Sequence, residues 1–134
     1  MPGRSPSPLR PRAQSAETSL RPTRAEILLG VIADNFRVVR KAAGTRKVLA
    51  VVKADAYGHG AVEVATALTD ADAFAVATVS EGVALRAAGI TQKIIIMGGF
   101  VRLAELQACI DHSLDPVLHH QFHLDCLRDA ADLG

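Results

Sequence analysis

The sequence contains few of the cysteines that cross-link small proteins and few of the aromatic residues that fill their cores. Its 134 residues include two cysteines, no tryptophan and one tyrosine, and aromatic residues make up only 4%. The two cysteines, Cys109 and Cys126, cannot build the multi-bridge framework of a small secreted domain, and both fit ordinary helix faces. No apolar stretch is long enough for a signal peptide or a membrane span. These absences predict a soluble, cytoplasmic protein without a membrane partner.

Neither sign of charge dominates the chain. Its formal net charge is +1, and beyond residue 24 ten basic residues stand against thirteen acidic ones. This balance gives no electrostatic attraction to a phosphate backbone, so we expect no nucleic-acid partner. Hydrophobic residues make up 49% and charged residues 22%, which is typical of a soluble domain with a core of moderate size.

The first 24 residues differ in composition from the rest. They contain five of the six prolines and five arginines, against the single acidic residue Glu17. Such a segment cannot bury enough apolar surface to offset its ordering entropy, so residues 1–24 are predicted to be a disordered leader. An acid-poor, arginine-rich leader also fits a transit peptide, although repeated prolines disfavour the amphipathic helix that one needs. The folded domain is expected at residues 25–134.

Beyond the leader, strand and helix patterns alternate. The apolar run Val48–Val52 predicts a strand that is buried on both faces, as in a parallel sheet. Thr78 and Glu81 have capping-box spacing, and their helix is expected to close at Gly89 with Leu85 on its buried face. The other expected extended segments are 23–29, 74–77, 94–97 and 117–118, and the other helices are 31–41, one starting at 61, 103–110 and 121–133. Successive strand-helix units fit either a barrel or an open doubly wound sheet.

Lys53 directly follows the first expected core strand and precedes the glycine-containing loop Ala54–Gly60. α/β proteins place their chemistry at the carboxyl ends of parallel strands. A partly desolvated amine at such a place takes up the neutral, nucleophilic form that builds Schiff bases more readily. The alternative is a lysine that merely ends a strand and reaches for solvent. Lys53 is the leading candidate for a catalytic residue.

The segment Val51–Gly60 (VVKADAYGHG) resembles the cofactor-lysine signature of alanine racemases, which are pyridoxal-phosphate enzymes with an eight-stranded α/β barrel. The resemblance covers about residues 21–120. Its other elements, in the family's order, are Arg21–Ile27, Asn35, Phe74–Thr78, Glu81, Leu85–Arg86, Ala88–Ile90 and Ile94–Gly98. One departure is visible at Leu28, where the family commonly has an acidic residue.

This resemblance implies an α/β fold, namely the amino-terminal portion, about half, of a (β/α)₈ TIM-type barrel with parallel strands. A whole barrel needs roughly 250 residues, so residues 25–134 are expected to be an incomplete barrel domain, as a fragment or a truncation. Lys53 would hold pyridoxal 5'-phosphate and act as one acid/base. Tyr57 would bind the cofactor phosphate through its hydroxyl group; the alternative is a plain loop aromatic at the barrel mouth.

The implied reaction is the interconversion of L-alanine and D-alanine, which supplies D-alanine for peptidoglycan. In the family, a tyrosine from the carboxy-terminal domain of a partner subunit is the second acid/base. The full-length form is therefore expected to be a homodimer, and the 134-residue chain alone to be inactive, because its one tyrosine is Tyr57. The alternatives are a non-catalytic pyridoxal-phosphate-binding barrel protein and a remnant α/β domain.

Other residues near the motif have weaker interpretations. Gly58 and Gly60 form a G-x-G after a strand, but Glu63 at the third fingerprint position argues against a dinucleotide site. His59 matches the family motif, with no role beyond fixing the turn. Met97 is either an apolar residue near the cofactor ring, as the resemblance implies, or a core methionine at a strand end.

His119, His120 and His123 form the densest group of histidines. His119 and His123 have the i, i+4 spacing of two zinc ligands on a helix, but no third ligand accompanies them at a fixed spacing. We therefore expect partly exposed polar histidines and no metal site.

Overall fold

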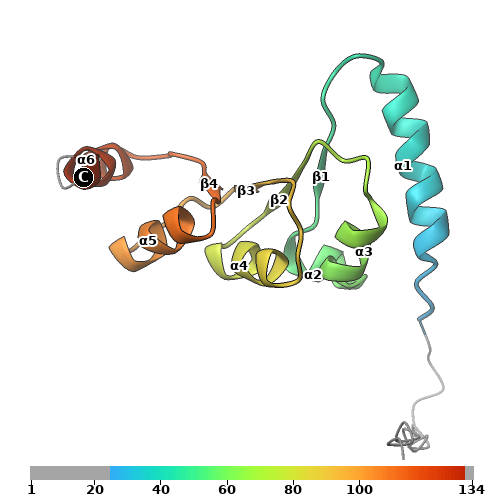
Figure 1. Cartoon of the computed structure of the whole chain (residues 1–134), viewed down its shortest axis with the longest axis horizontal. Helices are drawn as coiled ribbons and strands as arrows, with labels where there is room; N and C mark the ends of the chain where they lie inside the picture. Colours follow the sequence, from blue (N-terminus) through green and yellow to red (C-terminus); the bar gives the residue numbers. More distant parts are fainter. Residues whose placement is uncertain (1–24, 132–134) are drawn as a thin grey trace, which may run out of the picture.

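The computed structural model describes residues 25–131, in which helices and strands alternate along the chain (Figure 1). The expected leader at 1–24 and the last three residues lie outside this range. The elements are α1 Leu29–Ala43, β1 Leu49–Val51, α2 Lys53–Gly58, α3 Ala61–Ala67, β2 Ala73–Val76, α4 Val79–Ala87, β3 Lys93–Ile96, α5 Leu103–Asp111, β4 Asp115–Pro116 and α6 Gln121–Ala131. No helix among the described residues is long and apolar enough to cross a membrane.

The four strands form one parallel sheet in the order β1-β2-β3-β4. Each strand lies beside its successor in the sequence, without the reversal of order that marks a doubly wound sheet. Right-handed crossovers in this order place all the connecting helices on one face, as in a barrel. Of the two topologies that the sequence pattern left open, the structure therefore has that of a (β/α)₈ barrel portion. In Figure 1, α1 stands at one end of the molecule beside α3, and α6 lies at the other end.

The core lies between the sheet and the helices. Phe74 pairs in register with Ile94, and Val76 pairs with Ile96, and all four side chains are fully buried. Leu85 of α4 is also buried, which confirms the expected inner face of that helix. Burial of each large apolar side chain contributes about 1.5–3 kcal/mol, so these two rows contribute strongly to holding the helices against the sheet.

β1 is not buried on both faces, and that prediction from its apolar run was wrong. Leu49 is 40% exposed and Val51 is 37% exposed, whereas Ala50 between them is partly buried in the core. β1 is an edge strand, and within residues 25–131 its face opposite the helices is left uncovered. A continuous apolar run indicates that both faces of a strand favour burial, but it does not determine whether other segments cover both faces.

The ends of several elements differ from the expected ones. β2 and β3 each begin and end one residue early, α1 extends beyond 31–41, and Leu29 of the extended segment expected at 23–29 belongs to α1. The strand expected at 117–118 was wrong, because β4 is Asp115–Pro116, paired with Ile95 and Ile96. Proline lacks an N–H and is rare inside strands, so the sequence pattern favoured the apolar pair that follows it.

The expected capping box at the start of α4 is confirmed. The backbone N–H of Glu81 donates to Thr78 Oγ1 (3.3 Å), and the N–H of Thr78 donates to Glu81 Oε2 (3.0 Å). The helix ends at Ala87, and Gly89 closes it as expected: its N–H donates to Arg86 O (2.9 Å), and its φ of 88° turns the chain so that the Ile90 N–H donates to Leu85 O (3.1 Å). Both ends of α4 are therefore fixed by local hydrogen bonds.

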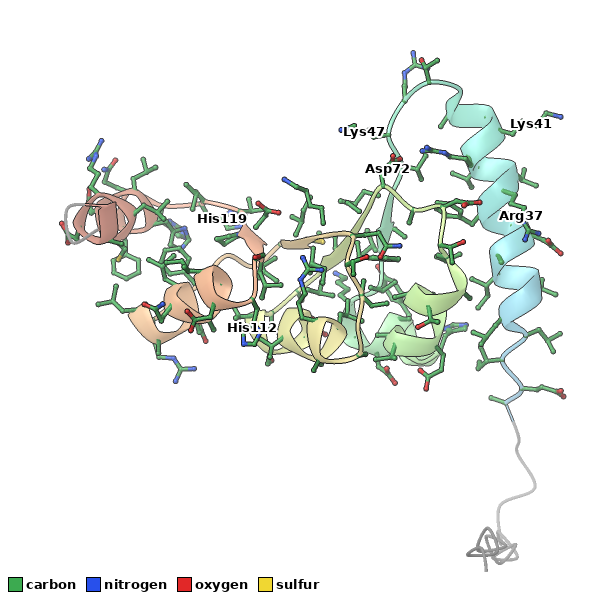
Figure 2. All side chains as sticks on the ribbon, viewed as in Figure 1. Arg37, Lys41, Lys47, Asp72, His112 and His119 are labelled. Atoms are coloured by element: carbon green, nitrogen blue, oxygen red, sulfur yellow. The ribbon has the colours of Figure 1, made fainter. Side chains whose placement is uncertain are left out.

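Arg86 at the end of α4 joins the turns that surround it. Its guanidinium donates to the carbonyl of Gln92 (2.8 Å) before β3, and to those of His112 and Ser113 (both 2.9 Å) before β4. Figure 2 shows His112 between α4 and α5. Hydrogen bonds from a charged donor contribute about 1.5–3 kcal/mol, so Arg86 fixes the spacing of two consecutive units.

Asp72 connects α1 to the start of the sheet. Its carboxylate accepts a hydrogen bond from the Val48 N–H (2.6 Å) and forms an ion pair with Arg40 of α1. Figure 2 shows Asp72 at the amino-terminal end of the strands, opposite α2. The Val48 hydrogen bond, and next the Arg40 side chain, lower the pKa of Asp72 below its ordinary value of 3.8.

Replacing Asp72 with Asn should lower the free energy of unfolding at neutral pH, because the Val48 N–H and Arg40 lose an anionic acceptor. An aspartate with a lowered pKa stabilises the fold above its unfolded-state pKa and loses this contribution as pH falls through its folded-state pKa. The difference between wild type and Asp72→Asn should therefore be constant above about pH 5 and shrink below pH 3.8. Denaturant titrations at both ends of this pH range measure it, and a difference that persists at low pH would contradict the assignment.

Candidate active site

Lys53 lies at the carboxyl edge of the sheet, as the sequence predicts. The N–H of Val52 donates to Ala75 O (2.8 Å), which continues the pairing of β1 with β2 by one residue, and Lys53 then begins α2. Its side chain is half-buried. The other lysines of the chain are all exposed, namely Lys41, Lys47 and Lys93. Lys53 is therefore less exposed to solvent than every other lysine of this chain.

The segment after Lys53 is a left-handed helical turn and not an irregular loop. Ala54, Asp55, Ala56 and Tyr57 all have φ between 51° and 56°. A left-handed conformation costs roughly 1–2 kcal/mol for each residue with a Cβ atom, so four in a row need support from their surroundings. Backbone strain of this kind clusters at functional sites, where the surrounding structure maintains it.

Hydrogen bonds hold the exit of this turn. Asp55 O accepts from the Gly60 N–H (2.9 Å), and Asp55 Oδ1 accepts from the Ala61 N–H (2.7 Å) at the start of α3. His59 Nδ1 lies 2.9 Å from Ala56 O, and its backbone N–H donates to the same carbonyl at 3.1 Å. His59 thus has the turn-fixing contacts that its place in the motif suggested.

Glu81 holds the entrance of the turn. Its Oε1 accepts a hydrogen bond from the Ala54 N–H (2.8 Å), directly after Lys53. Its Oε2 accepts from the N–H groups of Ala77 (2.8 Å) and Thr78 (3.0 Å) at the end of β2. One carboxylate therefore joins the segment that carries Lys53 to the neighbouring strand and helix. The sequence pattern predicted no role for Glu81 other than that of a helix cap, and the resemblance added only that the family has a matching residue. Lys53 and Glu81 nevertheless follow two strands that are adjacent in the sheet.

The surroundings of Glu81 keep it ionised. Partial burial by itself raises the pKa of this carboxyl group, but hydrogen bonds from the N–H groups of Ala54, Thr78 and Ala77 outweigh that effect and lower the pKa below 4.5. Glu81 is therefore an acceptor at neutral pH and has no proton to donate. In this ionised state the carboxylate accepts hydrogen bonds from all three N–H groups at once.

Tyr57 closes the left-handed turn four residues after Lys53, and its side chain is 61% exposed. The structure places both residues on one short turn at the same edge of the sheet. Met97, directly after β3, is 41% exposed, so the interpretation as a buried core methionine was wrong. An amine that can attack a carbonyl carbon and a phenol that can donate to an anion therefore share this edge.

The histidine group supports the loop before α6. His123 is only 3% exposed, so the expectation of partly exposed histidines was wrong for this residue. His123 Nδ1 accepts from the His119 N–H (2.9 Å), and Nε2 lies 2.7 Å from Phe100 O, which assigns the proton to Nε2. His119 Nε2 lies 2.7 Å from Met97 O, and Figure 2 shows His119 on the segment leading to α6. Both ring nitrogens of His123 are thus engaged by backbone groups.

The two cysteines lie on helices α5 and α6, as expected. Cys109 and Cys126 are both buried with free thiols. Burial, and next the charge of Glu105, raise the pKa of the Cys109 thiol. A raised pKa keeps this thiol protonated and unreactive, so Cys109 acts as a small apolar core residue.

The fold and this edge define a class: part of a parallel α/β barrel with a half-buried lysine where its first strand ends. A family described as alanine racemase, N-terminal domain, matches residues 27–133. The chain belongs to this family. This confirms the resemblance seen in the sequence, including the barrel fold that the resemblance implied.

Individual relatives agree with this assignment. The alanine racemase of an Azoarcus species is 48% identical over 113 residues, which are 84% of this chain and 32% of that protein. The catabolic alanine racemase of Pseudomonas aeruginosa is 46% identical over 113 residues, again 84% of this chain and 31% of that protein. The chain therefore spans about a third of the length of the curated relatives that it matches.

Solved structures match in the same region. The alanine racemase of Acinetobacter baumannii superposes with a TM-score of 0.75 at 31% identity, covering 79% of this chain and 32% of that one. The biosynthetic alanine racemase of Pseudomonas aeruginosa gives a TM-score of 0.72 at 37% identity, covering 76% and 29%. The chain thus corresponds to about a third of each of these larger structures.

Proposed function

We propose that the protein to which these residues belong is an alanine racemase that uses pyridoxal 5'-phosphate to interconvert L-alanine and D-alanine. The observation that carries the proposal is the position of Lys53: half-buried, at the carboxyl edge of the sheet, and on a strained turn held at both ends. Membership of the alanine racemase family supports the same reaction. Cytoplasmic synthesis of D-alanine for peptidoglycan is part of this proposal.

The donor set at this edge fits the cofactor. Pyridoxal phosphate presents an aldehyde, which needs a primary amine, and a phosphate group, which needs hydrogen-bond donors. Lys53 supplies the amine and Tyr57 a phenol hydroxyl, four residues apart on one turn. We assign Lys53 to covalent attachment and Tyr57 to the phosphate. We also assign Met97, exposed after β3, to contact with the cofactor ring.

When bound, the cofactor supplies an electron sink for the carbon that loses its proton. The amine of Lys53 would remove or return a proton on one face of that carbon. Glu81, ionised and engaged with three N–H groups, is not a proton donor in this scheme. One acid/base on one face accounts for half of a racemisation.

The second face requires another acid/base. We propose that it is a tyrosine from the carboxy-terminal domain of a partner subunit, as the family resemblance implies, and therefore that the active form is a homodimer. Tyr57 is the one tyrosine of this sequence, and we have assigned it to the phosphate. The uncovered face of β1, with Leu49 and Val51 exposed, is consistent with further strands packing there.

Lys53 is predicted to be the residue to which the cofactor attaches. After incubation of the protein, as its gene encodes it, with pyridoxal phosphate and reduction with borohydride, peptide mapping should find the pyridoxyl group on Lys53. Attachment at Lys41, Lys47 or Lys93 would refute the assignment. Lys53→Arg should abolish attachment, since a guanidinium keeps its proton, and should lower kcat by at least roughly a hundredfold.

The same experiment separates the racemase from a non-catalytic carrier of pyridoxal phosphate. A racemase attaches the cofactor at Lys53 and also interconverts the two alanine enantiomers, as chiral chromatography of both forms measures. A carrier shows the attachment without the interconversion.

Tyr57→Phe should weaken cofactor binding, because the phosphate, a charged acceptor, would lose the hydrogen bond that the Tyr57 hydroxyl donates. The expected loss is roughly 1.5–3 kcal/mol, or about a ten- to hundredfold rise in the cofactor Kd. The rate at saturating cofactor should fall much less than in Lys53→Arg. A fluorescence titration with pyridoxal phosphate measures the Kd, and an unchanged value would make Tyr57 a plain loop aromatic.

The 134-residue chain expressed alone should not racemise alanine. It would offer an acid/base to one face only, and within residues 25–131 the sheet edges β1 and β4 have no further strand beside them. Exchange of the α-proton of alanine with solvent deuterium could proceed slowly without inversion. The assay measures both enantiomers under saturating pyridoxal phosphate, and turnover near that of an intact racemase would show that the second face is served from within this chain.

A further inference from the structure

Glu81 makes two contacts beyond those of the capping box, one with the neighbouring Ala77 N–H and one with a distant segment. As the third residue of α4, it accepts the Thr78 N–H, which completes the capping box. Its other oxygen, Oε1, accepts the N–H of Ala54, which lies 27 residues earlier in the chain. Since Ala54 directly follows Lys53, this contact acts on the backbone from which the lysine side chain projects.

We propose that Glu81 is a positioning residue for Lys53, which fixes the start of the left-handed turn so that the amine is presented to the cofactor. This inference rests on the proposed function. Glu81 itself does not touch the cofactor in this scheme. It acts through the hydrogen bond between its Oε1 and the Ala54 N–H (2.8 Å).

The turn needs such an acceptor at its entrance. The first N–H groups of any helix have no carbonyl partner within the helix, and in α2 the N–H of Ala54 is among them. Ala54 is also the first residue of the left-handed run, with φ 51° and ψ 51°. An acceptor fixed to a different element therefore holds the peptide plane between Lys53 and Ala54, from which the left-handed run starts. The hydrogen bonds of Asp55 at the exit do not reach this position.

A carboxylate suits this position better than an amide. Its two oxygens are divided, with Oε1 facing Ala54 on the Lys53 side and Oε2 facing Ala77 and Thr78 on the β2 side. The side chain of glutamine has one oxygen and one NH₂ group, so one of the two sides would meet a donor instead of an acceptor. Glu81→Gln keeps the size of the side chain and removes only this double acceptance.

α5 offers a matched comparison. Glu105 is likewise the third residue of its helix and accepts the N–H of Val101 (2.8 Å), with Arg102 Nη2 at 3.0 Å from its other oxygen. Both partners of Glu105 lie just before α5, so it caps its own helix only. Glu105→Gln thus disturbs a helix start of the same kind at a distance from the turn that carries Lys53.

The test compares three variants of the protein as its gene encodes it: Glu81→Gln, Glu105→Gln and Thr78→Ala. Thr78→Ala removes the hydroxyl cap of α4 but keeps the N–H donors to Glu81. Two quantities are measured. One is the rate at which added pyridoxal 5'-phosphate becomes attached to Lys53, from borohydride quenching and peptide mapping. The other is amide hydrogen exchange over residues 54–57 without cofactor.

Glu81→Gln should slow attachment at Lys53 by about tenfold or more, the equivalent of one hydrogen bond to a charged group. It should also speed amide exchange over residues 54–57. Glu105→Gln and Thr78→Ala should leave the attachment rate unchanged, even where their unfolding midpoints fall as far as that of Glu81→Gln. Slower cofactor attachment in Glu81→Gln alone would show that Glu81 positions Lys53, and that the effect is not a general loss of stability.

Two results overturn the inference. The first is attachment in Glu81→Gln at the wild-type rate, and the second is equal slowing in all three variants, since either would make Glu81 a helix cap only. If the wild-type protein attaches no cofactor at Lys53, the proposed function fails instead. Faster exchange over residues 54–57 in Glu81→Gln would still show that Glu81 fixes the turn.

Discussion

The parallel register of β1 with β2 is the constraint on which the site depends. Because neighbouring parallel strands end at the same edge, the residue after β1 and the start of α4 after β2 lie side by side, although Ala54 and Glu81 are 27 residues apart. A strand that slipped by one residue would turn Phe74 and Val76 away from the helices and would separate Glu81 from Ala54. The fully buried rows Phe74–Ile94 and Val76–Ile96 prevent this slip, so apolar packing in the core sets the geometry of the polar edge.

Much of the fold could be predicted from local patterns, because its signals are local. The capping box at Thr78 and the glycine that ends α4 involve residues a few positions apart, and both were confirmed. Predictions failed where the outcome depends on distant neighbours. The exposure of Val51 follows from the edge position of β1, and the burial of His123 follows from carbonyl and N–H groups that the fold brings to its ring.

The candidate site divides in the same way. The motif around Lys53 predicted the place of the lysine and of Tyr57, since both sit on one short segment whose position follows from the strand before it. The left-handed turn between them could not be predicted, because alanine and tyrosine disfavour positive φ, and a single aspartate, though of a residue type enriched there, does not indicate four such residues in a row. The link from Glu81 was missed for another reason: its local role as a cap already accounted for its residue type.

The left-handed turn also has a consequence for the order of events during synthesis. Its exit can be held as soon as Ala61 has been made, since Asp55 and Ala61 are six residues apart. Its entrance waits for Glu81, and hence for β2 and the first turn of α4 to leave the ribosome and pair with β1. Contacts between residues far apart in sequence form late, because the intervening chain must first lose its freedom. A nascent chain that has just passed Lys53 therefore carries its reactive amine on an unfinished turn, which is completed by the next repeat unit of the barrel.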